Sequence, residues 1–82
     1  MTTLTRTQKK TRVYAKKVWC DDTMLHVQLT DDRVISTPLT WFPTLAKATK
    51  EQRSHWELIG KGSGIHWEDI DEDISVASLL GG

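Results

Sequence analysis

Residues 24–39, MLHVQLTDDRVISTPL, decide the fold of this chain. Within them, Leu25, Val27 and Leu29 alternate with polar side chains. A period of two is typical of a strand that is buried on one face. A short polar connection then leads into a second run that is rich in β-branched residues. The stretch therefore predicts an antiparallel hairpin with strands at Met24–Leu29 and Val34–Leu39.

A further strand precedes this hairpin. Residues 13–20, VYAKKVWC, are rich in β-branched and aromatic side chains and predict a strand that a polar turn at residues 21–23 connects to the next one. Pro38 lacks the N–H that a central strand needs, so the last strand ends there or lies at an edge of the sheet. Three consecutive strands in this arrangement predict an antiparallel meander.

Short helices follow the meander. Pro43 suits the first position of a helix, because its fixed φ is helical and its missing N–H would have no partner there. Thr49 and Gln52 have the spacing of a capping box, in which each side chain bonds the backbone N–H of the other residue. The pattern predicts a second short helix over residues 50–57.

The C-terminal third has a less regular pattern. Three glycines at alternate positions in residues 60–64 break regular structure. Residues 65–67 are a short strand or an extended segment, and Ser75 caps a last helical turn that Gly81 ends. The predicted fold class is α+β, a three-stranded antiparallel meander packed with short helices, with an extra short strand as an option.

Length and composition indicate one small soluble domain. The chain has 82 residues, which we divide into a flexible basic tail, residues 1–11, and a single α+β domain, residues 12–82. No apolar run approaches the roughly 18 residues of a membrane span, so we expect no membrane association. The single cysteine, Cys20, excludes an intrachain disulfide. It is typical of a reducing compartment, and we expect a cytoplasmic protein.

The charges balance in sum but not along the chain. Residues 1–20 carry six basic side chains and no acid, whereas residues 21–82 carry five basic and eleven acidic ones. The basic segment is either a solvated tail or an arm for nucleic acid or for an acidic partner. The residues that would contact nucleic acid are Arg6, Lys9, Lys10 and Arg12.

Five of the eleven acids crowd into residues 68–73. Such crowding produces self-repulsion, which a basic protein partner would relieve while being steered to the site. The alternative is a solvated loop whose carboxylates cap a helix and order the glycine-rich segment. The predicted partner-binding residues are Glu68, Asp69, Asp71, Glu72 and Asp73, with Trp19 as an exposed aromatic side chain.

Four tryptophans are many for so short a chain. Each can bury about 150–250 Å² of surface. We expect Trp41, Trp56 and Trp67 to form much of the core. Trp19 stands between lysine and aspartate residues and suits the core and an interface equally well.

Motifs for catalysis or metal binding fail on their spacing. Residues 60–64, GKGSG, lack the order of a phosphate-binding loop. Asp69, Asp71 and Asp73 match the start of a calcium loop, but Ile74 stands where its glycine belongs. A looser divalent site in this stretch is the remaining alternative. The soft ligands fit no standard zinc pattern: Cys20, His26, His55 and His66. We expect no enzymatic activity, no cofactor and no bound metal.

Five spaced segments together resemble one bacterial family. They are VISTPLTWFP at 34–43, ATKEQR at 48–53, WELIG at 56–60, GIHW at 64–67 and DEDISV at 71–76. With this combination, residues 13–81 closely resemble the small bacterial proteins grouped as domain of unknown function 2442. One difference is Asp31-Asp32 at the hairpin turn, where members often carry Asp-Gly.

The resemblance implies a compact α+β fold and brings no established catalytic or cofactor residues. Members are often encoded beside a small toxin-like protein. This implies a protein-interaction domain that acts as the antitoxin of a toxin–antitoxin pair, with a small basic toxin as its partner. The alternatives are a transcriptional regulator or nucleic-acid-associated protein, or an acidic inhibitor that imitates nucleic acid. The oligomeric state is left open.

Overall fold

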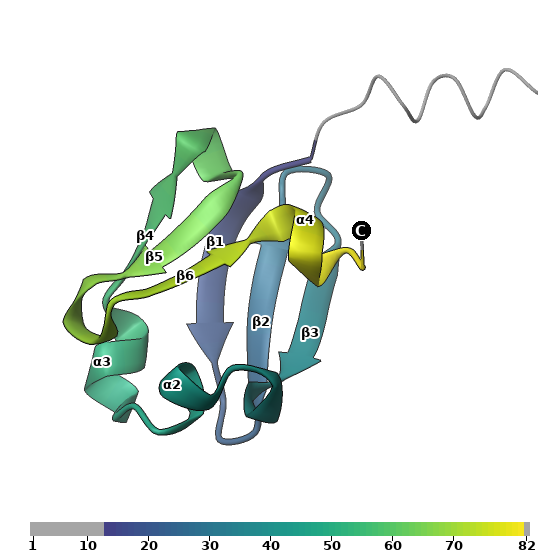
Figure 1. Ribbon diagram of the computed structural model, residues 1–82. Helices are drawn as coiled ribbons and strands as arrows, with labels where there is room; N and C mark the ends of the chain where they lie inside the picture. The colour runs from purple at the N-terminus through teal and green to yellow at the C-terminus, as the bar shows by residue number, and fades with distance from the viewer. Residues whose placement is uncertain (1–12, 82) are drawn as a thin grey trace, which may run out of the picture.

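The computed structural model describes residues 13–81, which form two three-stranded sheets with short helices around them (Figure 1). The first sheet contains β1 (Ala15–Cys20), β2 (Met24–Leu29) and β3 (Val34–Pro38). The second contains β4 (Trp56–Ile59), β5 (Gly64–Trp67) and β6 (Glu72–Ser75). The helical turns are η1 (Leu39–Trp41), α2 (Pro43–Ala46), α3 (Lys50–Ser54), η2 (Gly60–Gly62), η3 (Glu68–Ile70) and α4 (Val76–Leu79). The predicted α+β class is confirmed.

The first sheet is the predicted meander. β1 pairs with β2, and β2 with β3, in antiparallel register. Leu25, Val27 and Leu29 are fully buried, whereas His26 and Gln28 between them are half-buried on the opposite face. The alternation in the sequence therefore identifies the face of β2 that packs into the core.

The turn between β2 and β3 uses an aspartate where a glycine is common. Asp32 has a φ of 73°, and Asp adopts this left-handed conformation more readily than most residues. Its N–H donates to the carbonyl of Leu29, 2.9 Å away, while the Leu29 N–H donates to the carbonyl of Arg33 at 2.8 Å. The Asp31 carboxylate accepts from the Arg33 N–H. The Asp-Asp turn thus forms without glycine.

The second sheet was not predicted from the sequence. The helix expected over residues 50–57 ends at Ser54, and Trp56 already begins β4. The optional strand at residues 65–67 is present as β5, and residues 72–75, for which no strand was predicted, form β6. A strand of four residues directs only two side chains inward, so its alternation is too short to recognise.

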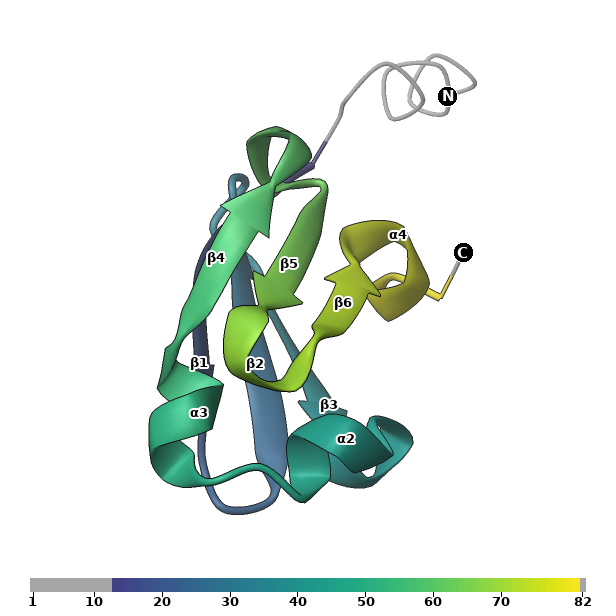
Figure 2. The same ribbon diagram turned by 60° about the vertical axis from the view of Figure 1, so that its left-hand side comes forward.

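The core lies between the two sheets, which stack face to face (Figures 1 and 2). Leu25 and Val27 come from the first sheet, and Ile65 and Trp67 from the second, all fully buried. Leu45 of α2 adds another fully buried side chain. The outer faces of both sheets are left to solvent, and the candidate functional residues lie there. Within residues 13–81, no helix combines the length and the apolar character needed to cross a bilayer.

The tryptophans differ in burial. Trp67 is fully buried, as predicted, and its Nε1–H donates to the carbonyl of Arg53 at 3.0 Å. Trp56 is half-buried, less than predicted. The prediction for Trp41 was wrong, since its side chain is 69% exposed. Trp41 ends the single turn η1, in which Leu39 takes the buried position.

Side chains fix α2 and α3 to each other. Thr49 Oγ1 accepts from the Gln52 N–H and Gln52 Oε1 from the Thr49 N–H, both at 3.0 Å, which confirms the capping box. The guanidinium of Arg53 donates to the carbonyls of Leu45 and Ala46 near the end of α2. Arg53 thereby satisfies carbonyls that a short helix leaves without intrahelical partners.

The last helix begins at the predicted cap. Ser75 Oγ accepts from the Ser78 N–H at 3.1 Å, and the helix ends before Gly81, whose φ is 83°. The alternative in which Asp71 or Asp73 caps this helix is therefore wrong. Asp73 has a different partner on the outer face of the second sheet.

Candidate functional site

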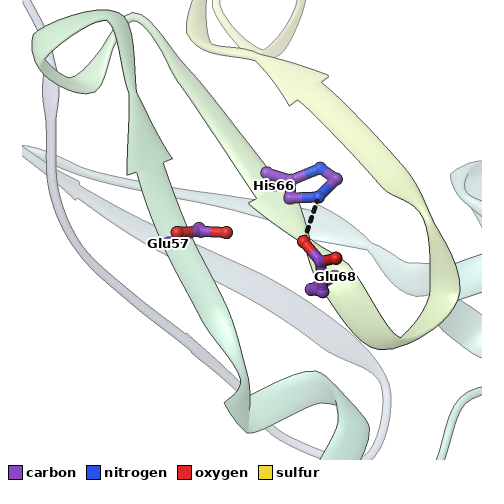
Figure 3. Close-up of side chains that lie close together, drawn as sticks. All are labelled: Glu57, His66 and Glu68. Atoms are coloured by element: carbon purple, nitrogen blue, oxygen red, sulfur yellow. Dashed lines mark hydrogen bonds and ion pairs between the residues drawn. The ribbon is translucent and has the colours of Figure 1, made fainter.

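The outer face of the second sheet brings three polar side chains into one row. Glu57 on β4, His66 on β5 and Asp73 on β6 are cross-strand neighbours in the antiparallel register. The residues on either side of His66 are buried, so its own side chain points outward. Glu68, directly after β5, lies beside it (Figure 3). We call these four residues the acidic face.

Carboxylates approach both ring nitrogens of His66. Nδ1 lies within hydrogen-bond distance of Asp73, and Nε2 lies 3.2 Å from Oε1 of Glu68. Glu57 is close as well, because ligand atoms of Glu57, His66 and Glu68 all lie within 4.8 Å of one another. The hydrogen bond to Asp73, reinforced by Glu68, raises the pKa of His66 above its ordinary value. In the protonated form, both nitrogens donate.

The other three acidic residues of 68–73 lie in different environments. Asp69 Oδ2 lies 2.7 Å from Nδ1 of His55, and this hydrogen bond raises the pKa of His55. Asp71 has a φ of 52° and ends η3. Glu72 is half-buried, in register with Trp67. The structure therefore gathers Glu68 and Asp73 around one histidine and gives Asp69 another.

Within the part of the chain that the structure describes, histidines are the only basic partners of this negative charge. Among residues 13–81, no lysine or arginine lies within ion-pair distance of Glu57, Glu68, Asp69 or Asp73. One protonated imidazole cannot balance the three carboxylates of the acidic face. The face therefore keeps a net negative charge at every protonation state of His66 in the neutral pH range.

Trp19 lies on β1 of the first sheet, whereas Glu72 and Asp73 lie on β6 of the second. Its indole stacks on the His26 imidazole, with ring centroids 5.4 Å apart, and Lys17 Nζ lies 5.6 Å from the indole centroid. The residue is 39% exposed. Trp19 is therefore a partly exposed side chain of β1.

A hydrogen-bonded chain holds His26 under this indole. Nε2 lies 2.8 Å from Asp21 Oδ2, and Nδ1 lies 2.7 Å from Ser36 Oγ. The order Asp–His–Ser has the hydrogen-bonding logic of an activated nucleophile. Acyl transfer also needs backbone donors aimed at the developing oxyanion. Ser36 lies in the middle of β3. Its hydrogen bond and that of Asp21 orient the His26 ring, on which the Trp19 indole stacks.

Two surface hollows flank these residues. One, of about 410 Å³, lies between β1, α3 and β4, with Trp19, Arg53 and Trp56 in its walls. Cys20 also lines it, and burial raises the pKa of this thiol. The other, of about 500 Å³, extends from Ile59 on β4 along β6, past Asp73 and Ser75 to the start of α4. The second hollow adjoins the acidic face.

The basic residues predicted to contact nucleic acid, and the whole predicted tail at residues 1–11, lie outside the described residues. They are Arg6, Lys9, Lys10 and Arg12.

Comparison with known proteins agrees with the sequence resemblance. Residues 15–82 match the family described as "Protein of unknown function (DUF2442)". The chain belongs to the DUF2442 family. No curated protein matches it.

Two solved structures share the fold of this DUF2442 domain. A protein of unknown function from Rhodospirillum rubrum is 28% identical, with a TM-score of 0.76, over 88% of this chain and 89% of that one. An uncharacterised protein from Chromobacterium violaceum is 22% identical, with a TM-score of 0.74, over 98% of this chain and 74% of that one. The second likeness shows the fold alone.

The sequence did not predict that Glu57 and His66 of the acidic face are neighbours. Glu57 lies nine positions before His66 in the DUF2442 domain, and only the β4–β5 pairing makes them neighbours. If WELI and GIHW are both recognised as strands, their single polar positions, Glu57 and His66, indicate side chains on the same outer face. Because residues 56–57 were assigned to a helix, this cross-strand contact was missed.

Proposed function

We propose that this chain is a small protein-interaction domain, the antitoxin of a toxin–antitoxin pair, and that its partner is a small basic protein. The observation that carries the proposal is the uncompensated charge of the acidic face. Three carboxylates surround one imidazole there, and Asp69 extends the charge toward His55.

Charge of one sign on one face favours a partner of the opposite sign. Lysine and arginine side chains of a basic protein would pair with Glu57 and Glu68, which no basic residue other than His66 contacts within residues 13–81. Such complementarity steers the encounter and raises the association rate most at low salt. The resulting mechanism is steric, because the bound domain covers a basic functional surface of its partner.

The surface next to the charge supplies an apolar contact. Ile59 is 44% exposed on β4, two residues from Glu57 and on the same face of the strand. The hollow of about 500 Å³ beside it has Phe42 and Ile74 in its walls together with serine hydroxyls. This mixture suits an arginine or lysine, whose apolar stem packs while its charged head reaches a carboxylate such as Asp73.

The test is coexpression with the product of the adjacent gene. We expect that product to arrest growth and the wild-type domain to relieve the arrest and to copurify with it. The double variant Glu68→Lys/Asp69→Lys should lose both effects. Its matched control, Asp22→Lys/Glu51→Lys, makes the same charge change at exposed positions elsewhere and should keep both. Circular dichroism checks that each variant is folded.

Three results would count against the proposal. The adjacent product does not arrest growth, the acidic-face variant still protects cells, or both double variants fail equally. Equal failure would show that total charge, and not this face, determines the interaction.

The transcriptional-regulator alternative depends on Arg6, Lys9, Lys10 and Arg12. These residues lie outside the described part of the chain, so it stays a prediction from the sequence. The inhibitor that imitates nucleic acid would use the same acidic face, and it differs from the antitoxin in binding a nucleic-acid-binding protein in competition with DNA or RNA.

A further inference from the structure

We propose that Glu57, His66 and Glu68 (Figure 3) bind one Zn²⁺ ion, with Asp73 as the positioning residue for His66. The site shares Glu57, Glu68 and Asp73 with the protein-interaction proposal, so bound Zn²⁺ would compete with a basic partner for these carboxylates. It does not depend on that proposal, because zinc binding needs only side chains of this chain. It also replaces the expectation of no bound metal, which rested on spacing along the sequence.

The ligand atoms are close enough for one ion. Those of Glu57, His66 and Glu68 lie within 4.8 Å of one another, and His66 Nε2 lies 3.2 Å from Glu68 Oε1. Zinc bonds of about 2.1 Å in tetrahedral geometry separate neighbouring ligand atoms by roughly 3.4 Å. Glu68 and His66 already have about this separation. Glu57 needs only a side-chain rotation, since its position opposite His66 is set by the β4–β5 register.

Asp73 gives His66 the arrangement of a zinc ligand. Histidines that bind metal almost always donate their second ring N–H to a carboxylate or carbonyl, which fixes the tautomer and the ring orientation. Here Nδ1 faces Asp73, leaving the Nε2 lone pair of the neutral ring directed toward Glu68. Across the three paired strands, Glu57 of β4 and His66 of β5 thus supply two ligands, and Asp73 of β6 orients His66.

Charge favours a divalent ion at this position. With His66 neutral, the three carboxylates of the acidic face carry three negative charges. Within residues 13–81 no lysine or arginine pairs with any of them. A proton on His66 removes one charge, whereas Zn²⁺ removes two. One nitrogen and two carboxylates are borderline donors that zinc accepts, while Ca²⁺ prefers oxygen ligands throughout.

Three protein ligands leave a fourth position for water. That is the pattern of an open zinc site, in contrast to closed structural sites with four protein ligands. The fourth position faces solvent, because Glu68 is 79% exposed at its side chain.

The experiment is isothermal titration of the purified chain with ZnCl₂ in chelator-free buffer. We expect one ion per chain, and no comparable heat with CaCl₂. His66→Gln and Glu57→Gln should each weaken binding by more than tenfold, and Asp73→Asn by about 10–100-fold, the usual effect of removing such a support. The matched control is His55→Gln, since His55 also pairs with an exposed carboxylate but has no third ligand near it among the described residues.

A second readout identifies the coordinating atom. In ¹⁵N spectra of the imidazole rings, Zn²⁺ should shift Nε2 of His66 and leave the rings of His26 and His55 unchanged. Absence of zinc binding to the folded wild-type chain overturns the proposal. So does a zinc affinity that His55→Gln lowers as much as His66→Gln. Neither result bears on the toxin–antitoxin test, which uses no metal.

Discussion

The Trp19 indole lies stacked on the His26 imidazole, with 5.4 Å between ring centroids and 22° between their planes. Asp21 and Ser36 form hydrogen bonds with the two nitrogens of that imidazole, so the indole stacks on a ring whose orientation is fixed. An exposed tryptophan held in one orientation loses little entropy on binding, which is the property of an interface anchor. The first sheet thus carries a partly exposed, restrained tryptophan on a different sheet from His66 and Asp73.

Removing the His26 ring should make the Trp19 side chain more mobile and more accessible to solvent. We expect His26→Ala to increase acrylamide quenching of tryptophan fluorescence, measured with Trp41→Phe as background because Trp41 is the most exposed of the four. Gln28→Ala removes a half-buried side chain from the same face of β2 and serves as control. Equal quenching in the two variants would show that the stacking does not restrain the indole.

Trp67 should dominate the stability of the domain. Trp67→Ala removes a fully buried side chain and its hydrogen bond to Arg53, and we expect a loss of about 3–5 kcal/mol in denaturant unfolding. Trp41→Ala, at an exposed position, should change stability by less than about 0.5 kcal/mol. A loss below about 1 kcal/mol for Trp67→Ala would contradict its place in the core.

Gly62 should not tolerate a side chain. Its φ is 99°, and a Cβ there would lie 2.5 Å from the carbonyl oxygen of Ala15. We expect Gly62→Ala to destabilise the domain by more than about 1–3 kcal/mol, the usual cost of backbone strain alone. Gly81→Ala is the control, because Gly81 has a φ of 83° with open space around it. Similar losses of stability for both variants would exclude the close contact with Ala15 of β1 as the cause.

Asp21 should make stability fall in acid. Hydrogen bonds from His26 and from the backbone N–H groups of Thr23 and Met24 lower the pKa of Asp21 below its ordinary value. Its contribution is therefore complete above about pH 4 and is lost as the pH falls further.

The matching measurement is unfolding of Asp21→Asn. We expect this variant to be less stable than wild type at about pH 6 and closer to it at about pH 2.5. Asp22→Asn, which removes only a 3.9 Å contact with Lys50, should change little at either pH. A constant difference between Asp21→Asn and wild type would exclude the carboxylate's charge as the cause.

The first sheet was predictable because its pattern is local. Six residues of β2 alternate cleanly, and the turns on both sides are polar. The capping signals of α3 and α4 were also correct, since each rests on residues three positions apart. The end of α3 was not, because Trp56 and Leu58 continue an apolar pattern that a helix would also accept.

The candidate site was predictable only in part. The crowding of acids at residues 68–73 is visible in the sequence, and the structure does place Glu68 and Asp73 together. The histidine between them, and Glu57 opposite, depend on pairing among β4, β5 and β6. Trp19 was grouped with the acids as an exposed aromatic side chain of the kind that anchors interfaces, but it lies on the first sheet, whereas Asp73 lies on the second.

The most direct test of the central claim is the association rate of the domain with the product of the adjacent gene, measured by stopped flow over a series of salt concentrations. If the acidic face steers a basic partner, the wild-type rate falls steeply as salt rises. Glu68→Lys/Asp69→Lys then binds more slowly with a flatter salt dependence, while Asp22→Lys/Glu51→Lys keeps the rate and slope of the wild type. Unchanged kinetics in a folded Glu68→Lys/Asp69→Lys variant would contradict the claim.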